Sequence, residues 1–440
     1  MHEPRIALAA ENLSRRDFIQ GAGAIAAALG ITLSEAAQAQ EKRAQALKEA
    51  RPVNCAFIGL GSQGYGTDLK RALSVPGVRM VALCDIYEPN LNRALKDCPG
   101  AQGYKDYRAV LDRKDVEAVL IATPLYLHAP MTVDALNAGK HVFCEKMMAY
   151  DIEGAKRMAR AARDSGKVLQ IGHQRRSNLI YNHGWEHVNE AKALGKVTHV
   201  RAQWNRNGGK RETWQRPVPP DTTHRHWCWR LYKEYSQGLI AELGTHQIHV
   251  ANWYLGEAPK AVVGIGGIDY WKDGREVFDN IMVIYEYPSG VKLNYTSLTT
   301  NQYDGFYEQF MGKDGTLIVS QETGGQFYKE PSSEGEEWMK HAVNPTKGAR
   351  GQTGLQLDPE ATKKLSKTGV KVGEKTLTSD AKGKDDYLLE MEDFFNSVRA
   401  GTPISCDWRD GLAATVAAVR GNEAMEKQAR IEIPPTDYQI

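Results

Sequence analysis

A glycine-rich turn between a predicted strand and a predicted helix constrains the fold of this chain more than any other feature. The turn is Gly59-Leu60-Gly61-Ser62-Gln63-Gly64, after the apolar run 53–58 and before a helical pattern at 67–73. Glycines at these positions allow a tight turn and let the backbone approach a pyrophosphate, whose charge the N-terminus of the helix attracts. The pattern therefore predicts a dinucleotide-binding β-α-β unit.

An acidic residue follows at the distance that such a unit requires. Asp85 ends the next apolar run, 79–84, and stands 21 residues after Gly64. Its carboxylate can accept hydrogen bonds from two ribose hydroxyls, and it would repel a 2′-phosphate. No Arg or Lys occurs in the residues directly after it, 86–89. We therefore predict NAD rather than NADP as the cofactor.

The N-terminus has the three parts of an export signal. Ser14-Arg15-Arg16-Asp17-Phe18-Ile19 is a twin-arginine pattern, an apolar stretch of small residues follows at 21–33, and Ala37-Gln38-Ala39 is a cleavage site. The alternative is an amphipathic helix that happens to hold two arginines. We expect residues 1–39 to be a signal read by the twin-arginine export machinery, with 40–50 as a helical linker. The apolar stretch is too short for stable insertion in a membrane.

Export in folded form would place the protein in the periplasm, where free NAD is scarce. The cofactor would then have to be loaded before export, stay bound and return to its starting redox state in each catalytic cycle.

Composition excludes several classes of protein. The net charge is +2 and no basic cluster interleaves with aromatic residues, so we expect no nucleic-acid partner. Hydrophobic content of 42% and charged content of 25% are ordinary for a globular protein. The six cysteines show no C-x-x-C spacing, and we interpret them as reduced thiols in the core.

Two domains are expected from the order of the elements. Strands and helices alternate from 53 to 172, which is typical of an α/β domain with a doubly wound parallel sheet, and we assign residues 51–173 to it. Longer strands with hairpin-like turns follow, so residues 174–440 are expected to form an α+β domain with a large, mostly antiparallel open sheet. Residues 321–384 are polar and are expected to be an irregular surface insertion, followed by helices at 385–399 and 410–430.

A predicted helix from Gly238 to Leu255 carries a candidate catalytic group. Glu242, His246 and His249 stand at i, i+4 and i+7, on one face of a regular helix. A carboxylate that holds an imidazole raises its basicity, which suits proton transfer. The same three residues can also ligate zinc, or form a polar face with no catalytic role, and we predict no metal because no metal-binding spacing supports one.

Lys146 is a second candidate, because it follows a predicted buried strand at the sheet edge where ligands bind. Its cation can hold a substrate hydroxyl, although it can equally be a surface lysine. An aromatic and histidine-rich segment, 224–230, precedes the Glu242 helix. Its rings suit the apolar faces of sugars, or the packing of a domain core.

Together these motifs resemble the Gfo/Idh/MocA oxidoreductases. The resemblance rests on the glycine turn with Asp85, on Ala122-Thr123-Pro124 with His128, on Glu145-Lys146, on Gly172-His173-Gln174-Arg175-Arg176, on the Glu242–His249 helix and on Gly401-Thr402-Pro403. It implies a sugar or polyol substrate and a second-domain sheet that forms a homo-oligomer interface.

The resemblance also implies the roles of individual residues. Lys146, Glu242 and His246 become the catalytic group. The implied contacts to the dinucleotide are Gly59, Leu60, Gly61, Ser62, Gln63, Gly64, Asp85, Thr123, Pro124, His128, Glu145, Lys146 and Arg175. The chain departs from the family pattern where Met147 replaces a proline, where Glu242 replaces an aspartate and where His249 replaces a second aspartate.

Three functions fit these observations. The first is an NAD-dependent oxidoreductase that acts on a sugar or polyol hydroxyl. The second is a glycoside hydrolase that oxidises its substrate transiently with a retained NAD, although Leu243 stands where such glycosidases often carry a tyrosine. The third is a nucleotide-loaded binding protein without turnover.

Overall fold

The computed structural model describes residues 51–207, 213–330, 345–347, 353–356 and 385–440. These residues belong to one compact unit, Ala50–Ile440. The predicted export signal and linker, residues 1–50, lie outside the described residues, as does most of the predicted insertion 321–384. Among the described helices, none combines the length and the apolar character that a membrane span would need.

The first sheet is parallel and confirms the predicted doubly wound domain. Its six strands run in the order β3-β2-β1-β4-β5-β6. The strands are β1 Val53–Ile58, β2 Val78–Cys84, β3 Gln102–Tyr104, β4 Ala118–Ile121, β5 His141–Glu145 and β6 Leu169–Gly172. Every residue of β4 is buried, as expected for a strand covered on both faces.

Helices cover both faces of this sheet, and the alternation of side chains along β1 divides them between two cores. Ala56 and Ile58 belong to a core that α6 and α7 share, whereas Cys55 and Phe57 belong to a core that α3 and α4 share. The helices are α3 Lys70–Ser74, α4 Glu88–Asp97, α5 Tyr107–Leu111, α6 His128–Asn137 and α7 Ile152–Ser165. The Asp151 carboxylate caps the start of α7 by accepting from the Gly154 N–H.

The second sheet has ten strands in the order β14-β15-β13-β12-β11-β7-β10-β9-β8-β16. All pairs are antiparallel except β7 with β10, which confirms the predicted mostly antiparallel sheet. The strands are β7 Val197–Asn205, β8 Ala261–Gly267, β9 Asn280–Glu286, β10 Lys292–Leu298, β11 Phe306–Gly312, β12 Gly315–Ser320, β13 Gly324–Lys329, β14 Pro345–Lys347, β15 Thr353–Gln356 and β16 Ile431–Glu432. Buried and exposed residues alternate along β9, so one face of the sheet packs on the core and the other does not.

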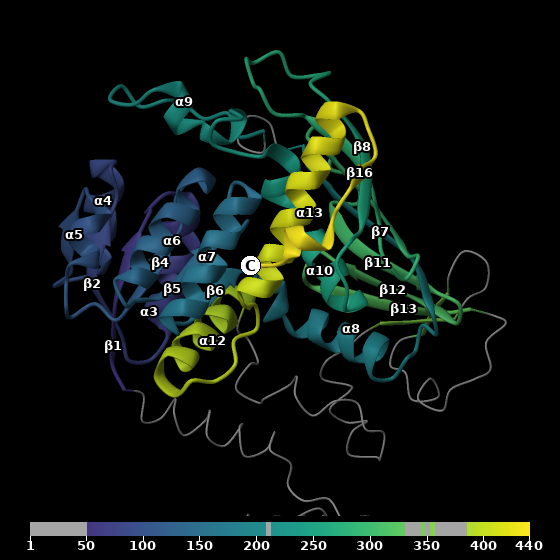
Figure 1. The fold of residues 1–440 in the computed structure, drawn as a ribbon, viewed down its shortest axis with the longest axis horizontal. Helices are drawn as coiled ribbons and strands as arrows, with labels where there is room; N and C mark the ends of the chain where they lie inside the picture. The colour runs from purple at the N-terminus through teal and green to yellow at the C-terminus, as the bar shows by residue number, and fades with distance from the viewer. Residues whose placement is uncertain (1–50, 208–212, 331–344, 348–352, 357–384) are drawn as a thin grey trace, which may run out of the picture. The chain divides into compact units, whose positions relative to one another are not determined.

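The remaining helices connect or flank the two sheets. They are α8 Leu179–Asn189, α9 His224–Trp227, α10 Thr245–Leu255, α12 Asp386–Ala400 and α13 Trp408–Lys427, with short helical turns at Leu125–Leu127, Gln174–Arg176, Trp229–Leu231 and Pro435–Tyr438. Wider π-helical turns occur at Gly64–Leu69 and Ile240–Gly244. Figure 1 shows α13 in yellow, and it packs against α7 of the first domain and against α10 and β8 of the second.

The structure differs from the sequence prediction in two places. Residues 324–329, expected to be irregular, form β13 between β12 and β15, where Phe327 is buried in the core, and the short strands β14 and β15 also lie in the segment expected to be irregular. Helix α12, expected to belong to the second domain, packs on the first sheet, where Met391, Phe394 and Phe395 join the core of α3 and α4. The buried aromatic face of α12, and not its position in the chain, therefore decides where the helix packs.

Candidate active site

A cavity of about 1080 Å³ opens at the carboxyl ends of the strands of the first sheet and reaches residues of the second domain. Of the residues predicted from the sequence, its walls include Gly59, Gly61, Ser62, Gln63, Asp85, Thr123, Pro124, His128, Glu145, Lys146, Glu242 and His246. Leu60, Gly64 and Arg175 are not part of the wall. The fold thus brings the predicted cofactor and catalytic residues to one site.

Close contacts require glycine at two positions of the turn, Gly59 and Gly64. Gly59 has φ +93°, and a Cβ there would lie 2.7 Å from the carbonyl carbon of Ala122. A Cβ on Gly64 would lie 2.0 Å from the Gly59 oxygen, so this position packs the helix directly on the turn. A Cβ on Gly61 would meet nothing within 4 Å. Gly61 therefore leaves open space beside the helix start, where a pyrophosphate would fit.

Asp85 lies at the end of β2 and is held by the turn that it faces. One carboxylate oxygen accepts from the Leu60 N–H at 2.7 Å, and the other accepts from the Tyr87 N–H at 2.7 Å. Leu60 thus acts through its backbone, not as part of the cavity wall. The Asn90 amide also donates to the first of these oxygens, at 3.5 Å, so the second keeps a further lone pair that can accept from a ribose hydroxyl.

Basic residues near Asp85 were missed because they are distant in sequence. Arg93, Lys105 and Arg108 line the same end of the cavity. Lys105 pairs with Glu88 at 2.9 Å, and Arg108 pairs with Asp106 at 3.4 Å. Arg93 donates to the Leu60 carbonyl at 3.1 Å and stacks over the ring of Tyr65. The charges of Lys105 and Arg108 are paired with carboxylates, whereas Arg93 is held by neutral groups and acts on Asp85 through its charge.

His128 and Thr123 shape the wall beyond the glycine turn. His128 is buried, and its two ring nitrogens lie 2.8 Å from the Met147 carbonyl oxygen and 3.0 Å from the Thr123 carbonyl oxygen. It therefore links the loop after β4 to the segment after β5 and positions both. The Thr123 hydroxyl is buried without a partner among the described residues, so it can accept or donate to a bound dinucleotide.

Two buried carboxyl groups meet beneath the glycine turn. The Gln63 side-chain amide donates to Asp68 at 2.9 Å and to Glu145 at 3.2 Å. Burial raises the pKa of Asp68 well above its ordinary value, and the adjacent Glu145 raises it further. Burial likewise raises the pKa of Glu145. Neighbouring buried carboxyls of this kind favour sharing a proton over carrying two charges.

Lys146 and Glu242 bring the two domains together at the cavity. The Lys146 Nζ donates to the backbone oxygen of Glu242 at 2.6 Å. Burial lowers the pKa of Lys146, and the Glu242 and Glu145 carboxylates offset only part of that effect. The lysine therefore keeps its charge less firmly than a lysine in water, which suits a group that holds a hydroxyl during proton transfer.

Glu242 is not the partner of His246 that its spacing predicted. Its carboxylate accepts from the Arg230 Nε at 2.6 Å and from the Ser236 hydroxyl at 3.0 Å. Burial raises the pKa of Glu242, but the Arg230 and Lys146 cations outweigh burial, so the pKa is lowered. The reason for the difference is the π-helical turn Ile240–Gly244, whose wider hydrogen-bond pattern changes the face on which Glu242 lies.

His246 lies at the cavity on the first turn of α10. It is 5% exposed, and burial lowers its pKa well below the ordinary value of a histidine. The ring is therefore neutral near neutral pH and can accept a proton. Its Nδ1 is enclosed without a partner among the described residues, and its ring lies 5.5 Å from that of Trp204.

Aromatic residues from both domains line part of the cavity wall. They are Tyr126, Trp204, Trp214, Trp227, Trp229 and Tyr235. Tyr232, which is close to them in sequence, instead bonds the His224 ring at 2.6 Å. Sequence proximity indicated this aromatic wall but could not show which rings reach the cavity.

Arg175 lies in a buried ion-pair cluster of the second domain, away from the cavity wall. Its guanidinium is 1% exposed and pairs with Glu308 and, at 2.8 Å, with Glu322. The rings of Tyr181, Trp204 and Phe306 surround it. The structure therefore places Arg175 behind Trp204 and not beside the glycine turn.

Sequence profiles of one oxidoreductase family match most of the chain. The profile of its NAD-binding Rossmann fold matches residues 53–173, and the profile of its C-terminal α/β domain matches residues 190–433. The family is Gfo/Idh/MocA.

Individual proteins also resemble this chain in sequence or in fold. The NAD⁺-dependent scyllo-inositol 2-dehydrogenase of Bacillus subtilis is 24% identical over 271 residues, which cover 61% of this chain and 73% of that protein. A glycosyl hydrolase family 109 protein of Shewanella baltica is 33% identical over 162 residues, which cover 32% of this chain and 35% of that protein. The fold resembles that of levoglucosan dehydrogenase in complex with NADH and levoglucosan, with a TM-score of 0.68, 20% identity and coverage of 87% of this chain and 100% of that one.

Replacing Asp85 with serine is expected to shift cofactor selectivity from NAD toward NADP. The change removes a charged acceptor for the ribose and leaves Arg93 nearby. Because a hydrogen bond to a charged group contributes about 1.5–3 kcal/mol, NAD affinity should fall about ten- to a hundredfold. Calorimetric titration of nucleotide-free protein with NAD and with NADP measures both affinities.

Asp106→Ser is the matched control, since Asp106 lines the same cavity but caps α5 through the Arg108 N–H. Its NAD affinity should stay near that of the wild type. An unchanged NAD affinity in Asp85→Ser would show that Asp85 does not bind the ribose.

Proposed function

The chain belongs to the Gfo/Idh/MocA family of NAD-dependent oxidoreductases, and on that premise we propose that it oxidises or reduces a hydroxyl-bearing carbon of a sugar or polyol. The observation that carries the proposal is a single cavity bounded by the glycine turn, by Lys146 and His246, and by an aromatic wall. Aromatic faces stack on the apolar faces of sugar rings. The related inositol dehydrogenase supports a polyhydroxylated substrate.

The residues of the cavity have distinct roles in this reaction. NAD, held by the glycine turn and Asp85, would supply the hydride acceptor. Lys146 donates a hydrogen bond to the substrate hydroxyl and stabilises negative charge on its oxygen. His246 takes the hydroxyl proton on Nε2, since Nδ1 is enclosed by protein.

Glu242 acts on Lys146 through its charge and its position. Arg230 and Ser236 hold its carboxylate, and its backbone oxygen holds Lys146. Its charge keeps Lys146 protonated, while its carbonyl fixes the ammonium group beside the cavity. Glu242 is thus a positioning residue for Lys146 and not for His246.

A glycoside hydrolase that uses retained NAD is the second candidate. The match to a glycosyl hydrolase family 109 protein favours it, although that match covers only 32% of this chain. Aryl glycosides incubated with the purified protein and no added cofactor separate the two functions. Sustained release of the aryl group over many turnovers would establish the hydrolase, whereas consumption of added NAD with a sugar or polyol would establish the dehydrogenase.

Substitutions at the cavity are expected to separate catalysis from cofactor binding. Lys146→Ala and His246→Ala should each lower turnover by roughly two or more powers of ten, because groups that transfer or stabilise a proton contribute that much. The turnover of Glu242→Gln should lie between that of these two variants and that of the wild type. Glu242→Asp should also lose activity, since a shorter arm cannot reach both Arg230 and Ser236. The measurement is the rate per folded, NAD-loaded molecule.

The control is His199→Ala, which removes an exposed histidine of β7 and should leave the rate unchanged. NAD content should stay near the wild-type value in all variants. If His246→Ala keeps more than half of the wild-type turnover, His246 is not the general base.

We propose that the protein is exported by the twin-arginine route and acts in the periplasm with its NAD retained. Ser14-Arg15-Arg16 and the cleavage site at 37–39 support this proposal. Arg15→Lys combined with Arg16→Lys should leave folded protein in the cytoplasm, because a receptor reads the arginine pair and not its charge alone. Cell fractionation measures the distribution, and normal export of the double variant would refute the route.

We propose further that the exposed face of the second sheet joins copies of the chain. Val263 and Ile265 of β8 and Met282 and Ile284 of β9 form an exposed apolar strip, with Ile265 73% and Met282 63% exposed. Apolar strips of this kind mark interfaces. Ile265→Lys with Met282→Lys should reduce the mass in light scattering to that of one chain, whereas Tyr303→Lys, on an exposed loop, should not. An unchanged mass in the double variant contradicts an interface at this strip.

A further inference from the structure

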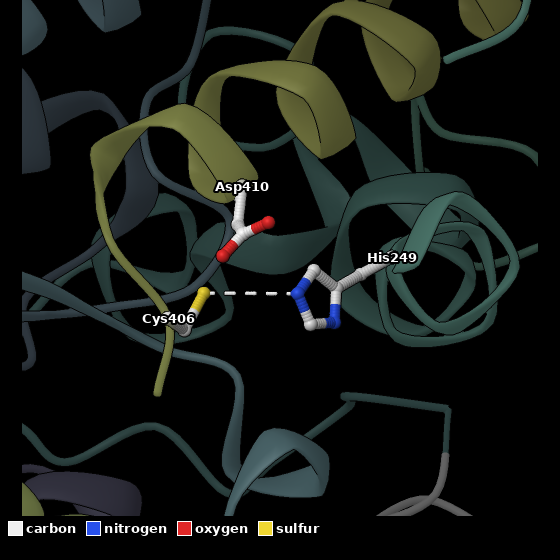
Figure 2. Close-up of side chains that lie close together, drawn as sticks. All are labelled: His249, Cys406 and Asp410. Carbon is white, nitrogen blue, oxygen red and sulfur yellow. Dashed lines mark hydrogen bonds between the residues drawn. The ribbon is translucent and has the colours of Figure 1, made fainter. Parts of the chain in front are cut away.

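Three side chains suited to metal binding converge beside α10, outside the cavity wall. They are His249 on α10, Cys406 just before α13 and Asp410 in the first turn of α13 (Figure 2). The His249 ring nitrogen, the Cys406 sulfur and an Asp410 oxygen all lie within 4.8 Å of one another. None of the three lines the cavity described above, so the cluster is separate from the proposed active site.

The geometry of the cluster matches a tetrahedral ion. The His249 Nε2 lies 3.7 Å from the Cys406 Sγ. A tetrahedral Zn²⁺ bound to sulfur at about 2.3 Å and to nitrogen at about 2.0–2.1 Å holds those two atoms about 3.6 Å apart. An ion can therefore enter between the imidazole and the sulfur with little movement of either. The Asp410 side chain is 34% exposed, so it can rotate to close the remaining gap.

The His249 ring has only weak hydrogen-bond partners among the described residues. His249 is 1% exposed, its Nε2 meets the weakly polar Cys406 sulfur, and its Nδ1 has no partner among the described residues. A thiol is a weak hydrogen-bond donor, so the imidazole gains little from it. An ion bound at Nε2 would replace this weak contact with a metal–ligand bond.

We propose that His249, Cys406 and Asp410 bind one zinc ion, with water in the fourth position. An imidazole, a thiolate and a carboxylate select zinc over calcium and magnesium, which prefer oxygen ligands alone. The thiolate and carboxylate together balance the charge of the ion. Arg176, whose Nη2 lies 3.5 Å from one Asp410 oxygen, stays outside the metal shell and orients that carboxylate.

The ion has a structural role in this arrangement. It joins α10 to the start of α13, and the Cys406 carbonyl already accepts from the Ile171 N–H of β6 at 3.1 Å. The His249 ring stacks on His173 at 4.2 Å, and His173 meets His246 edge-on at 5.9 Å. Zinc would thus hold α10 one turn beyond the proposed base His246, outside the cavity wall and without contact with substrate.

Metal binding by the full-length protein, purified without metal-affinity steps, tests the site. Dialysis against Zn²⁺ should leave one ion per chain by mass spectrometry of the elements. With Co²⁺ as the probe, a sulfur-to-cobalt charge-transfer band and tetrahedral d–d bands should appear. Cys406→Ser should abolish the charge-transfer band, whereas Cys98→Ser, which alters another buried cysteine, should keep it.

A second variant keeps the test valid if Cys406→Ser does not fold. Asp410→Asn should retain the charge-transfer band but bind Co²⁺ at least about tenfold more weakly, because the loss of a charged ligand lowers affinity by such factors. A wild-type protein with no charge-transfer band, or an Asp410→Asn variant with unchanged affinity, overturns the proposal. These readouts do not depend on enzymatic activity, so they stand apart from the test of the proposed function.

Discussion

The close approach of a strand, a turn and a helix at Gly59 and Gly64 is the constraint on which the rest of the site depends. A side chain on Gly64 would collide with the Gly59 oxygen, and one on Gly59 would collide with the backbone at Ala122. If a larger residue replaced Gly59 or Gly64, the helix could not begin directly behind the turn, and the space beside Gly61 would be lost. Asp85 then fastens the same turn to the end of β2 through the Leu60 N–H.

The charged groups of the cavity come from both domains, because the second domain covers the carboxyl ends of the first sheet. Lys146 comes from the first domain, and its Nζ donates a hydrogen bond to the backbone oxygen of Glu242 in the second domain. The Glu242 carboxylate is balanced by Arg230, so the cavity holds an ion-pair network instead of isolated charges. Breaking a buried network of this kind leaves an uncompensated charge, which is why each member constrains the others.

Histidines connect the cavity to the His249, Cys406 and Asp410 cluster beside α10. His246 lies at the cavity, His173 lies against it, and His249 stacks on His173 and faces Cys406. Burial lowers the pKa of His173 to about 3, so this ring is neutral as well. Because these rings are neutral and in contact, a shift of one ring displaces the next without moving charge.

The amino-acid sequence by itself determined the parallel sheet, the mostly antiparallel sheet and the glycine turn with Asp85, because hydrophobic runs and glycine positions are local signals. It also indicated Lys146 and His246 as residues of one site. Tertiary structure alone decided that α12 joins the first sheet, since only packing shows where Phe394 and Phe395 are buried. It decided that Glu242 faces Arg230 and Ser236, because a π-helical turn changes a spacing that a regular helix would keep. It also brought His249 to Cys406 and Asp410 across about 160 residues of chain, a distance at which sequence spacing carries no metal signal.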